Sequence, residues 1–88
     1  MLEDCKIRAF LEVERERNFT KAAKNMGITQ PAVSAQIAAL EEAIGLELFH
    51  RGRELALTPS GEIFLAYARR IQKAYDLTNE AFSNVFAK

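Results

Sequence analysis

The chain has 88 residues, with 12 basic and 12 acidic side chains, one histidine, one cysteine and a formal net charge of zero. This length fits one domain with a modest core, and the charge balance taken alone argues against a nucleic-acid binder. A lone Cys5 excludes an internal disulfide, and the sequence contains no signal peptide or long apolar span. We therefore expect a reducing, cytoplasmic setting and no membrane partner.

The segment 2–17 places apolar residues among charged ones at helical spacing. These residues are Ile7, Phe10, Leu11 and Val13. We expect a helix whose apolar side covers the elements that follow, with its acidic residues forming a solvated face. Cys5 is expected to be small and partly buried, and because no second cysteine or histidine motif surrounds it, we assign it no metal or catalytic role.

Two helices joined by a tight turn at Gly27 are predicted next. Thr20 is expected to cap the first helix, over 20–26, and Thr29 to cap the second, because each hydroxyl can accept a hydrogen bond from a free amide. Gly27 tolerates the left-handed backbone that ends a helix. Pro31 falls in the first turn of the second helix, where its missing N–H costs little.

These two helices have an apolar inner side and an outer side without carboxylates. The inner series is Phe19, Ala22, Ala23, Met26, Ile28, Val33, Ile37 and Leu40. The outward positions of the second helix are Gln30, Pro31, Ala32, Ser34, Ala35 and Gln36. Glutamine can pair with adenine through two hydrogen bonds, and small residues let a helix approach the bases of a major groove. Plain packing of a helical corner is the alternative for this stretch alone.

Charge is distributed unevenly along the chain. No Asp or Glu occurs between Arg17 and Leu40, whereas Arg17, Lys21 and Lys24 are present, and acidic residues precede and follow this stretch. A local positive surface can bind phosphate although the net charge is zero.

After Gly45, which is expected to end the second helix, two short apolar runs surround a basic turn. The runs are residues 46–49 and 55–57. They predict a small antiparallel hairpin, whose tip would carry Arg51 and Arg53 to phosphates or to a minor groove. An ordinary exposed turn with solvated charges is the alternative. His50, without a second ligand, predicts no metal site.

Thr58 and Pro59 predict the start of a helix that continues to Lys88. It would be about 45 Å long at 1.5 Å per residue, more than the core of this domain needs. Its apolar residues alternate at spacings of three and four, which predicts a seam paired with a second copy. The predicted dimer interface is Phe64, Tyr67, Ile71, Ala74, Tyr75, Thr78, Phe82 and Val85. Packing of the first half on Ile7 and Phe10 is the alternative, and both can hold.

Taken together, these residues resemble the N-terminal DNA-binding domain of the LysR-type transcriptional regulators. The resemblance rests on Ile7-x-x-Phe10-x-x-Val13, Asn18-Phe19-Thr20-x-Ala22-Ala23, Ile28-Thr29-Gln30-Pro31-Ala32-Val33-Ser34-x-Gln36-Ile37, Leu40-Glu41-x-x-x-Gly45, Leu48-Phe49-x-Arg51 and Leu57-Thr58-x-x-Gly61. It covers nearly the whole chain. It implies a mainly α fold, with a winged helix-turn-helix and a small two-stranded wing over 1–58 and a linker helix that dimerises over 59–88.

The resemblance also implies a set of DNA-binding residues. Base edges or nearby phosphates would face Gln30, Pro31, Ala32 and Ser34, the backbone would be anchored by Thr29 and Gln36, and the wing would use Arg51 or Arg53. Thr20, Lys21 and Ala35 complete the predicted set. Ala35 stands where many members have Arg or another large polar residue, so one possible contact is lost, and the wing is one residue shorter than the common form.

Members of this family carry a C-terminal effector-binding domain after the linker helix, and this chain lacks one. We interpret the chain as an excised DNA-binding domain rather than a naturally short protein. A small-molecule effector would act only through the missing domain, and a full-length protein would form a tetramer.

The sequence is compatible with three alternative functions. The first is a dimeric, sequence-specific module that binds double-stranded DNA at an inverted repeat and uses no cofactor or metal. The second is a helical interaction module that pairs with another protein through the stripe from Phe64 to Val85 and does not bind DNA. The third, an enzyme, has the least support, because one Cys, one His and scattered acids assemble no catalytic group.

Overall fold

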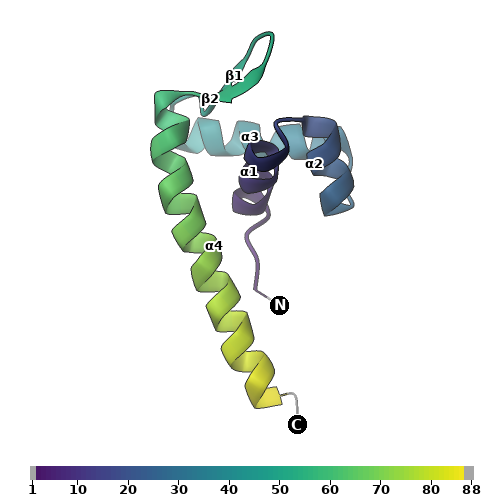
Figure 1. The fold of residues 1–88 in the computed structure, drawn as a ribbon, viewed down its shortest axis with the longest axis vertical. Helices are drawn as coiled ribbons and strands as arrows, with labels where there is room; N and C mark the ends of the chain where they lie inside the picture. The colour runs from purple at the N-terminus through teal and green to yellow at the C-terminus, as the bar shows by residue number, and fades with distance from the viewer. Residues whose placement is uncertain (1, 87–88) are drawn as a thin grey trace.

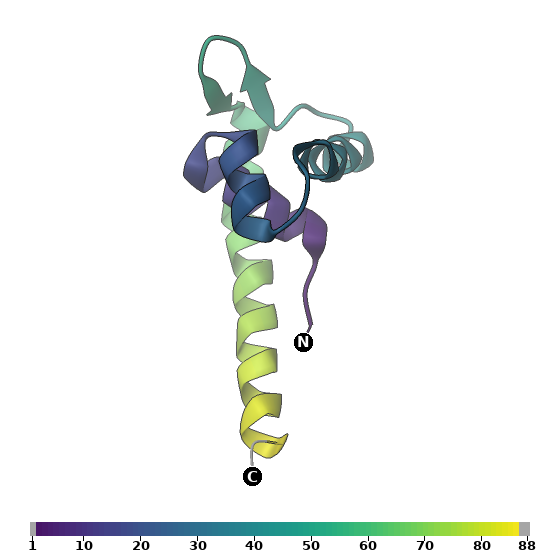
Figure 2. The same cartoon turned by 90° about the vertical axis from the view of Figure 1, so that its right-hand side faces the viewer.

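The computed structural model of the chain describes residues 2–86, which form four helices and one two-stranded hairpin (Figure 1). The elements are α1 (Cys5–Glu16), α2 (Phe19–Met26), α3 (Gln30–Ile44), β1 (Phe49–Arg51), β2 (Leu55–Leu57) and α4 (Pro59–Phe86). The first three helices pack together as a head, from which the hairpin and α4 extend to opposite ends of the molecule (Figure 2). The predicted mainly α fold with a wing and a long C-terminal helix is confirmed. The expected end of that helix at Lys88 lies outside the described residues.

Local chemistry sets the ends of the head helices. Gly27 ends α2 and Gly45 ends α3, both in the left-handed conformation, with φ of 68° and 82°. The Thr29 hydroxyl accepts a hydrogen bond of 3.2 Å from the Ala32 amide at the start of α3, where Pro31 occupies the first turn. The predictions for these three boundaries are confirmed, because each depends only on residues adjacent in the chain.

The predicted cap of α2 was wrong. The helix begins at Phe19, so Thr20 lies inside it, and the cap is Asn18, whose side-chain oxygen accepts a hydrogen bond of 2.8 Å from the Lys21 amide. Asn18 has an extended backbone, with φ of −159° and ψ of 118°. Asparagine caps helices at least as well as threonine, so the side chain that precedes the helical turn takes the role.

The core lies where α1, α2 and α3 meet the hairpin and the first half of α4. Its buried residues are Ile7, Ala9, Phe10, Val13, Ala22, Ala23, Val33, Ile37, Leu40, Leu48, Phe49, Leu65 and Ala68. The expected burial of Ile28 was wrong, because this residue lies in the turn between the helices and is 39% exposed. Cys5 is exposed at the first residue of α1 rather than partly buried.

The acidic residues of α1 do more than form a solvated face. The Asn25 amide on α2 donates hydrogen bonds to Glu12, at 3.1 Å, and to Glu16, at 2.7 Å, and Arg15 pairs with Glu12 at 2.7 Å. These carboxylates therefore link α1 to α2, which corrects the expectation for Glu12 and Glu16.

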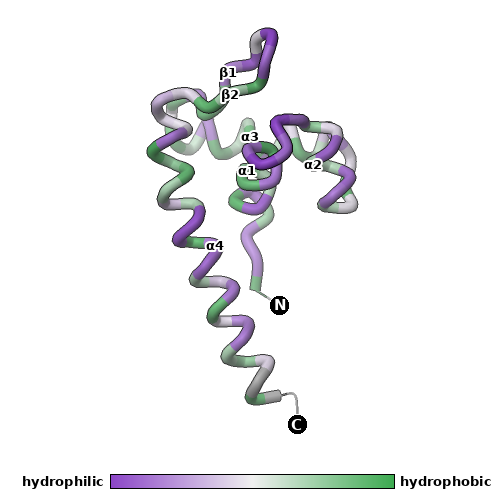
Figure 3. Tube along the Cα trace, viewed as in Figure 1, coloured by the Kyte–Doolittle hydropathy of each residue, from purple (hydrophilic) through white to green (hydrophobic). Residues whose placement is uncertain are grey.

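Helix α4 uses its first half for the core and continues well beyond it. The ring of Phe64 meets the ring of Phe10 edge to face, with centroids 4.8 Å apart, and Ala68 is fully buried. Hydrophobic and hydrophilic residues alternate along the rest of α4 (Figure 3). Near its far end, the Asn79 side chain exchanges two hydrogen bonds of 2.8 Å with the backbone of Leu2, which holds the N-terminal segment against α4. Among residues 2–86, no helix combines the length and apolar character needed to cross a membrane.

The start of α4 is fitted closely to the loop between α3 and β1. Thr58 is buried, and its hydroxyl donates to the Glu47 carbonyl at 2.6 Å and accepts from the Gly61 amide at 2.9 Å. A Cβ atom at Gly61 would lie 2.1 Å from the backbone oxygen of Leu48. Only glycine fits at this position without a shift of the backbone.

We expect Gly61→Ala to lower the free energy of unfolding by about 1–3 kcal/mol, because the added methyl group overpacks a backbone contact. Thermal and urea unfolding, followed by circular dichroism, would measure the change. Gly52→Ala is the matched control, since a Cβ there meets nothing within 4 Å. Equal stability of the two variants would contradict the expected clash.

Candidate nucleic-acid interface

The first half of α3 presents the predicted contact residues on its outer side. Gln30, Pro31 and Ala35 are exposed, and Ala32, Ser34 and Gln36 are half-buried. The opposite side of the helix carries Val33, Ile37 and Leu40 into the core. Helical periodicity therefore gave the correct orientation of this surface, and no carboxylate lies on it.

The polar groups of this surface are available to a ligand. Within residues 2–86, the side-chain amides of Gln30 and Gln36 make no hydrogen bond to the protein, so each retains donors and acceptors. In the first turn of α2, Thr20 and Lys21 are exposed. Among residues 2–86, neither side chain makes a hydrogen bond or an ion pair. The Thr29 hydroxyl is instead used as the cap of α3.

The hairpin separates its two arginines. Strands β1 and β2 pair antiparallel, with Arg51 opposite Leu55, so Arg53 lies in the tip between the strands. Arg53 is exposed and, among the described residues, has no ion-pair partner. Arg51 instead turns back to the body, where its guanidinium lies 3.1 Å from the carboxylate of Glu41 on α3.

An open basic pocket of about 410 Å³ lies between the hairpin and the start of α2. It is lined by Arg17, Asn18, Phe19, Arg51, Gly52, Arg53 and Leu55, with no acidic residue. The sequence-predicted set includes Arg51 and Arg53 but not Arg17 or Asn18. The signal that could have found Arg17 is the acid-free stretch, which begins at this residue.

Arg17 is held where α1 meets the hairpin. Its Nε donates to the Glu14 carbonyl at 3.1 Å, and Nη1 donates to the Leu55 carbonyl at 3.5 Å. The residue has a left-handed backbone, with φ of 52°, and it ends α1. Its charge therefore lies beside the exposed Arg53 in a pocket suited to an anion.

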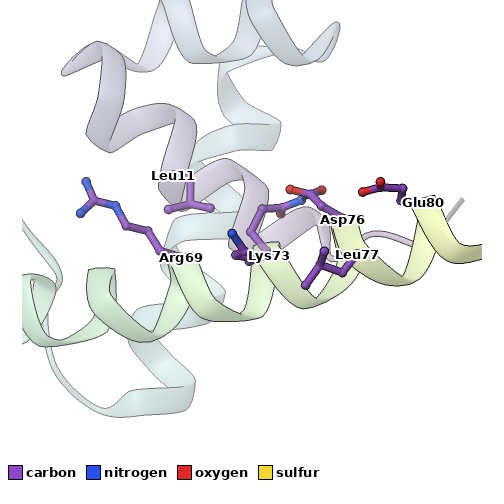
Figure 4. Close-up of a pocket in the computed structure, with 7 residues that line it drawn as sticks. Leu11, Arg69, Lys73, Asp76, Leu77 and Glu80 are labelled. Carbon is purple, nitrogen blue, oxygen red and sulfur yellow. Dashed lines mark hydrogen bonds between the residues drawn. The ribbon is translucent and has the colours of Figure 1, made fainter.

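A second hollow, of about 360 Å³, lies between α1 and α4 and has a different chemistry (Figure 4). It is lined by Leu11, Arg69, Gln72, Lys73, Asp76, Leu77 and Glu80. The Gln72 amide donates to Asp76 at 2.9 Å. This wall carries two basic residues, Arg69 and Lys73, and two acidic ones, Asp76 and Glu80, so it lacks the single-sign character of the first pocket. Among residues 2–86, no group of three or more His, Cys, Asp or Glu side chains is placed to hold a metal ion.

The predicted dimer residues divide between the core and an exposed stripe on α4. Phe64 packs on Phe10, and Tyr75 and Thr78 are half-buried. The exposed stripe consists of Ile63, Tyr67, Ile71, Ala74, Phe82 and Val85. Sequence reasoning missed Ile63, which adjoins an apolar groove of about 200 Å³ together with Ile44, Leu46, Leu48, Ser60, Phe64 and Tyr67.

Comparison with protein families gives a match over most of the chain. Residues 6–62 match the model described as "Bacterial regulatory helix-turn-helix protein, lysR family". A probable nitrogen assimilation transcriptional activator from Synechocystis is 41% identical over 80 residues, which are 91% of this chain and 26% of that protein. The HTH-type transcriptional regulator BudR from Klebsiella aerogenes is 47% identical over 75 residues, 84% of this chain and 52% of that protein. The chain thus spans about a quarter to a half of these relatives.

Solved structures match the fold along nearly the whole chain. The BenM DNA-binding domain in its catB site 1 DNA complex has a TM-score of 0.88 and 35% identity, with 99% of each chain covered. The CbnR DNA-binding domain, also solved with DNA, has a TM-score of 0.83 and 31% identity, with 99% of this chain and 100% of that chain covered.

Proposed function

The chain belongs to the lysR family of bacterial regulatory helix-turn-helix proteins, and we propose that it binds double-stranded DNA as a homodimer at an inverted-repeat promoter site. This is a family of transcriptional regulators rather than enzymes. In this proposal, residues 1–58 are the DNA-binding winged helix-turn-helix and residues 59–88 the linker segment that dimerises. The observation that carries it is the exposed, carboxylate-free side of α3 in a fold shared with domains solved on DNA.

Helix α3 would read bases from the major groove. Gln30 and Gln36 offer unpaired amides, which suit hydrogen bonding to base edges. The small Pro31, Ala32 and Ala35 let the helix approach the groove floor, and Ser34 adds a hydroxyl. Thr20 and Lys21, at the start of α2, would contact the phosphate backbone, whose contacts position the protein without specifying sequence.

The wing would add a contact outside the major groove. Arg53 is exposed at the hairpin tip, and the minor groove attracts arginine because of its negative potential. Arg17 and Asn18 border the same pocket and would support a phosphate there. Removing Arg53 should therefore weaken binding to every sequence.

Dimerisation through α4 is supported by its exposed stripe. Residues Ile63 and Tyr67 adjoin the apolar groove at the start of the helix, and Phe82 and Val85 are exposed near its end. An antiparallel pair would lay the end of one α4 on the partner's groove and cover both. With 28 residues, α4 would be about 42 Å long at 1.5 Å per residue, so the two heads would be far enough apart for half-sites about 34 Å apart. A heteromeric partner on the same stripe is the competing function.

Further partners belong to a longer regulator. Because the chain spans 26% of the Synechocystis relative, effector binding and any tetramer would involve other parts of such a protein. The proposed site of action is the bacterial cytoplasm, where chromosomal DNA lies.

A pair of substitutions tests the proposal on a duplex selected by the wild-type chain from random DNA. We expect Gln30→Ala to relax base preference, with discrimination at one position falling by about 1–3 kcal/mol. Arg53→Ala should weaken binding to all sequences and reduce the slope of log affinity against log salt by about 1. Mobility shifts across a salt series would measure both. If each variant bound every duplex as wild type does, the assigned interface would be wrong.

A further inference from the structure

Glu41 is the centre of a set of contacts between α3 and the wing. Its Oε2 accepts hydrogen bonds from the backbone amides of Leu48, at 2.8 Å, and Phe49, at 3.4 Å. The two carboxylate oxygens also accept from both terminal nitrogens of Arg51, at 3.1 and 3.5 Å. Only 13% of the Glu41 side chain is exposed. A carboxylate with this many donors and so little solvent is strongly fixed in place.

Arg51 carries the connection on to α2. Its guanidinium carbon lies 5.7 Å from the centre of the Phe19 ring, within range of a cation–π contact. The Phe19 ring in turn lies 6.4 Å from the ring of Phe49 on β1. Together, Glu41 and Arg51 join α3 to both ends of β1 and to the first residue of α2. The guanidinium donors that point to Glu41 are not free for a phosphate.

We propose that Glu41 and Arg51 are positioning residues that fix the wing relative to α3, so that Arg53 reaches the DNA when α3 lies in the major groove. This inference rests on the proposed DNA-binding function. It reassigns Arg51 from a predicted DNA contact to a brace within the protein. The hairpin has only three residues in each strand, so its own ladder gives it little rigidity, and the contacts at its base set its direction.

The two possible roles of Arg51, a DNA contact and a brace, predict opposite effects on binding when the negative charge of Glu41 is removed. If Arg51 contacted DNA, removal of Glu41 would free its guanidinium and delete a negative charge near the phosphates, and binding would stay equal or become tighter. If the pair is a brace, removal of Glu41 releases the wing and leaves the Leu48 amide without its acceptor. Binding then becomes weaker although the protein has become more positive.

The experiment is a double-mutant cycle between Glu41→Ala and Arg53→Ala, read by fluorescence anisotropy on the duplex selected by wild type. We expect each single variant to weaken binding about tenfold, and the double variant to lie within about twofold of Glu41→Ala alone. The matched control is Glu42→Ala, which removes the same charge from an exposed neighbour on α3. It is expected to leave the effect of Arg53→Ala unchanged.

Thermal unfolding of each variant shows whether it is folded at the assay temperature, so that a loss of folding is not taken for a loss of binding. If Glu41→Ala is not folded at the assay temperature, Glu41→Gln replaces it, because this residue retains an oxygen for the Leu48 amide but loses the ion pair. The brace is refuted if a folded Glu41 variant binds as tightly as wild type, or if the Arg53→Ala effect keeps its full size in that background. Failure of the wild-type chain to bind any selected duplex would instead refute the proposed function.

Discussion

Replacement of Ile71 with glutamate is expected to convert a dimer of this chain into a monomer and to weaken binding to an inverted repeat by about 10²–10⁴-fold. Ile71 lies in the middle of the exposed stripe on α4 and is 39% exposed in the single chain. In an antiparallel pair, each new carboxylate would be buried in an apolar seam without a partner. Each half-site would then have to bind its own chain from solution, and the gain from two linked heads on one duplex would be lost.

Two measurements separate this outcome from a general loss of affinity. Sedimentation would report the oligomeric state, and mobility shifts would compare an inverted repeat with a single half-site, on which the variant should equal wild type. Ala66→Glu is the control, because it adds the same charge to an exposed position on a different face of α4. A monomeric variant that still bound the inverted repeat at wild-type affinity would overturn the proposed mode of recognition. A chain that remained dimeric would overturn the assigned seam.

The parts of the fold that could be predicted are those fixed by neighbours in the chain. Gly27, Thr29 and Gly45 act on their own helix ends, and the sequence around them is sufficient to place those ends. The outward side of α3 follows in the same way from the period of the helix. The cap of α2 was missed because Asn18 and Thr20 are both good caps two residues apart, and only the backbone angles choose between them.

The parts that could not be predicted depend on contacts between distant residues. Glu41 and Arg51 are ten residues apart in different elements, and nothing in their spacing shows that one holds the other. The pocket beside the wing also depends on distant residues, because Arg17 and Arg53 are 36 positions apart in the sequence and line one pocket only in the folded chain. The sequence did not identify Ile63, because the predicted heptad seam passes through Phe64, which packs on Phe10 instead.

Phe10→Ala is expected to have the largest effect on stability, a loss of about 3–5 kcal/mol in the free energy of unfolding. Phe10 is fully buried, and its ring centre lies 5.3 Å from that of Phe49 on β1 and 4.8 Å from that of Phe64 on α4. The substitution therefore leaves a cavity at the point where α1, the hairpin and α4 meet. A domain of this size has a total stability of about 4–13 kcal/mol at about 0.05–0.15 kcal/mol per residue, so the loss is a large share of it.

The same substitution affects one role of α4, its packing on the core, and leaves the other, the exposed stripe, intact. Because the Phe10 ring joins the head to the first half of α4, the substitution weakens this packing but removes no side chain of the exposed stripe. Urea unfolding at one fixed protein concentration measures the loss, since dimerisation makes apparent stability depend on concentration. Leu11→Ala, on the same helix but half-buried, is the control and should cost less. A loss below about 1 kcal/mol for Phe10→Ala would mean that the cavity collapses, and the three elements would then not depend on this ring for their arrangement.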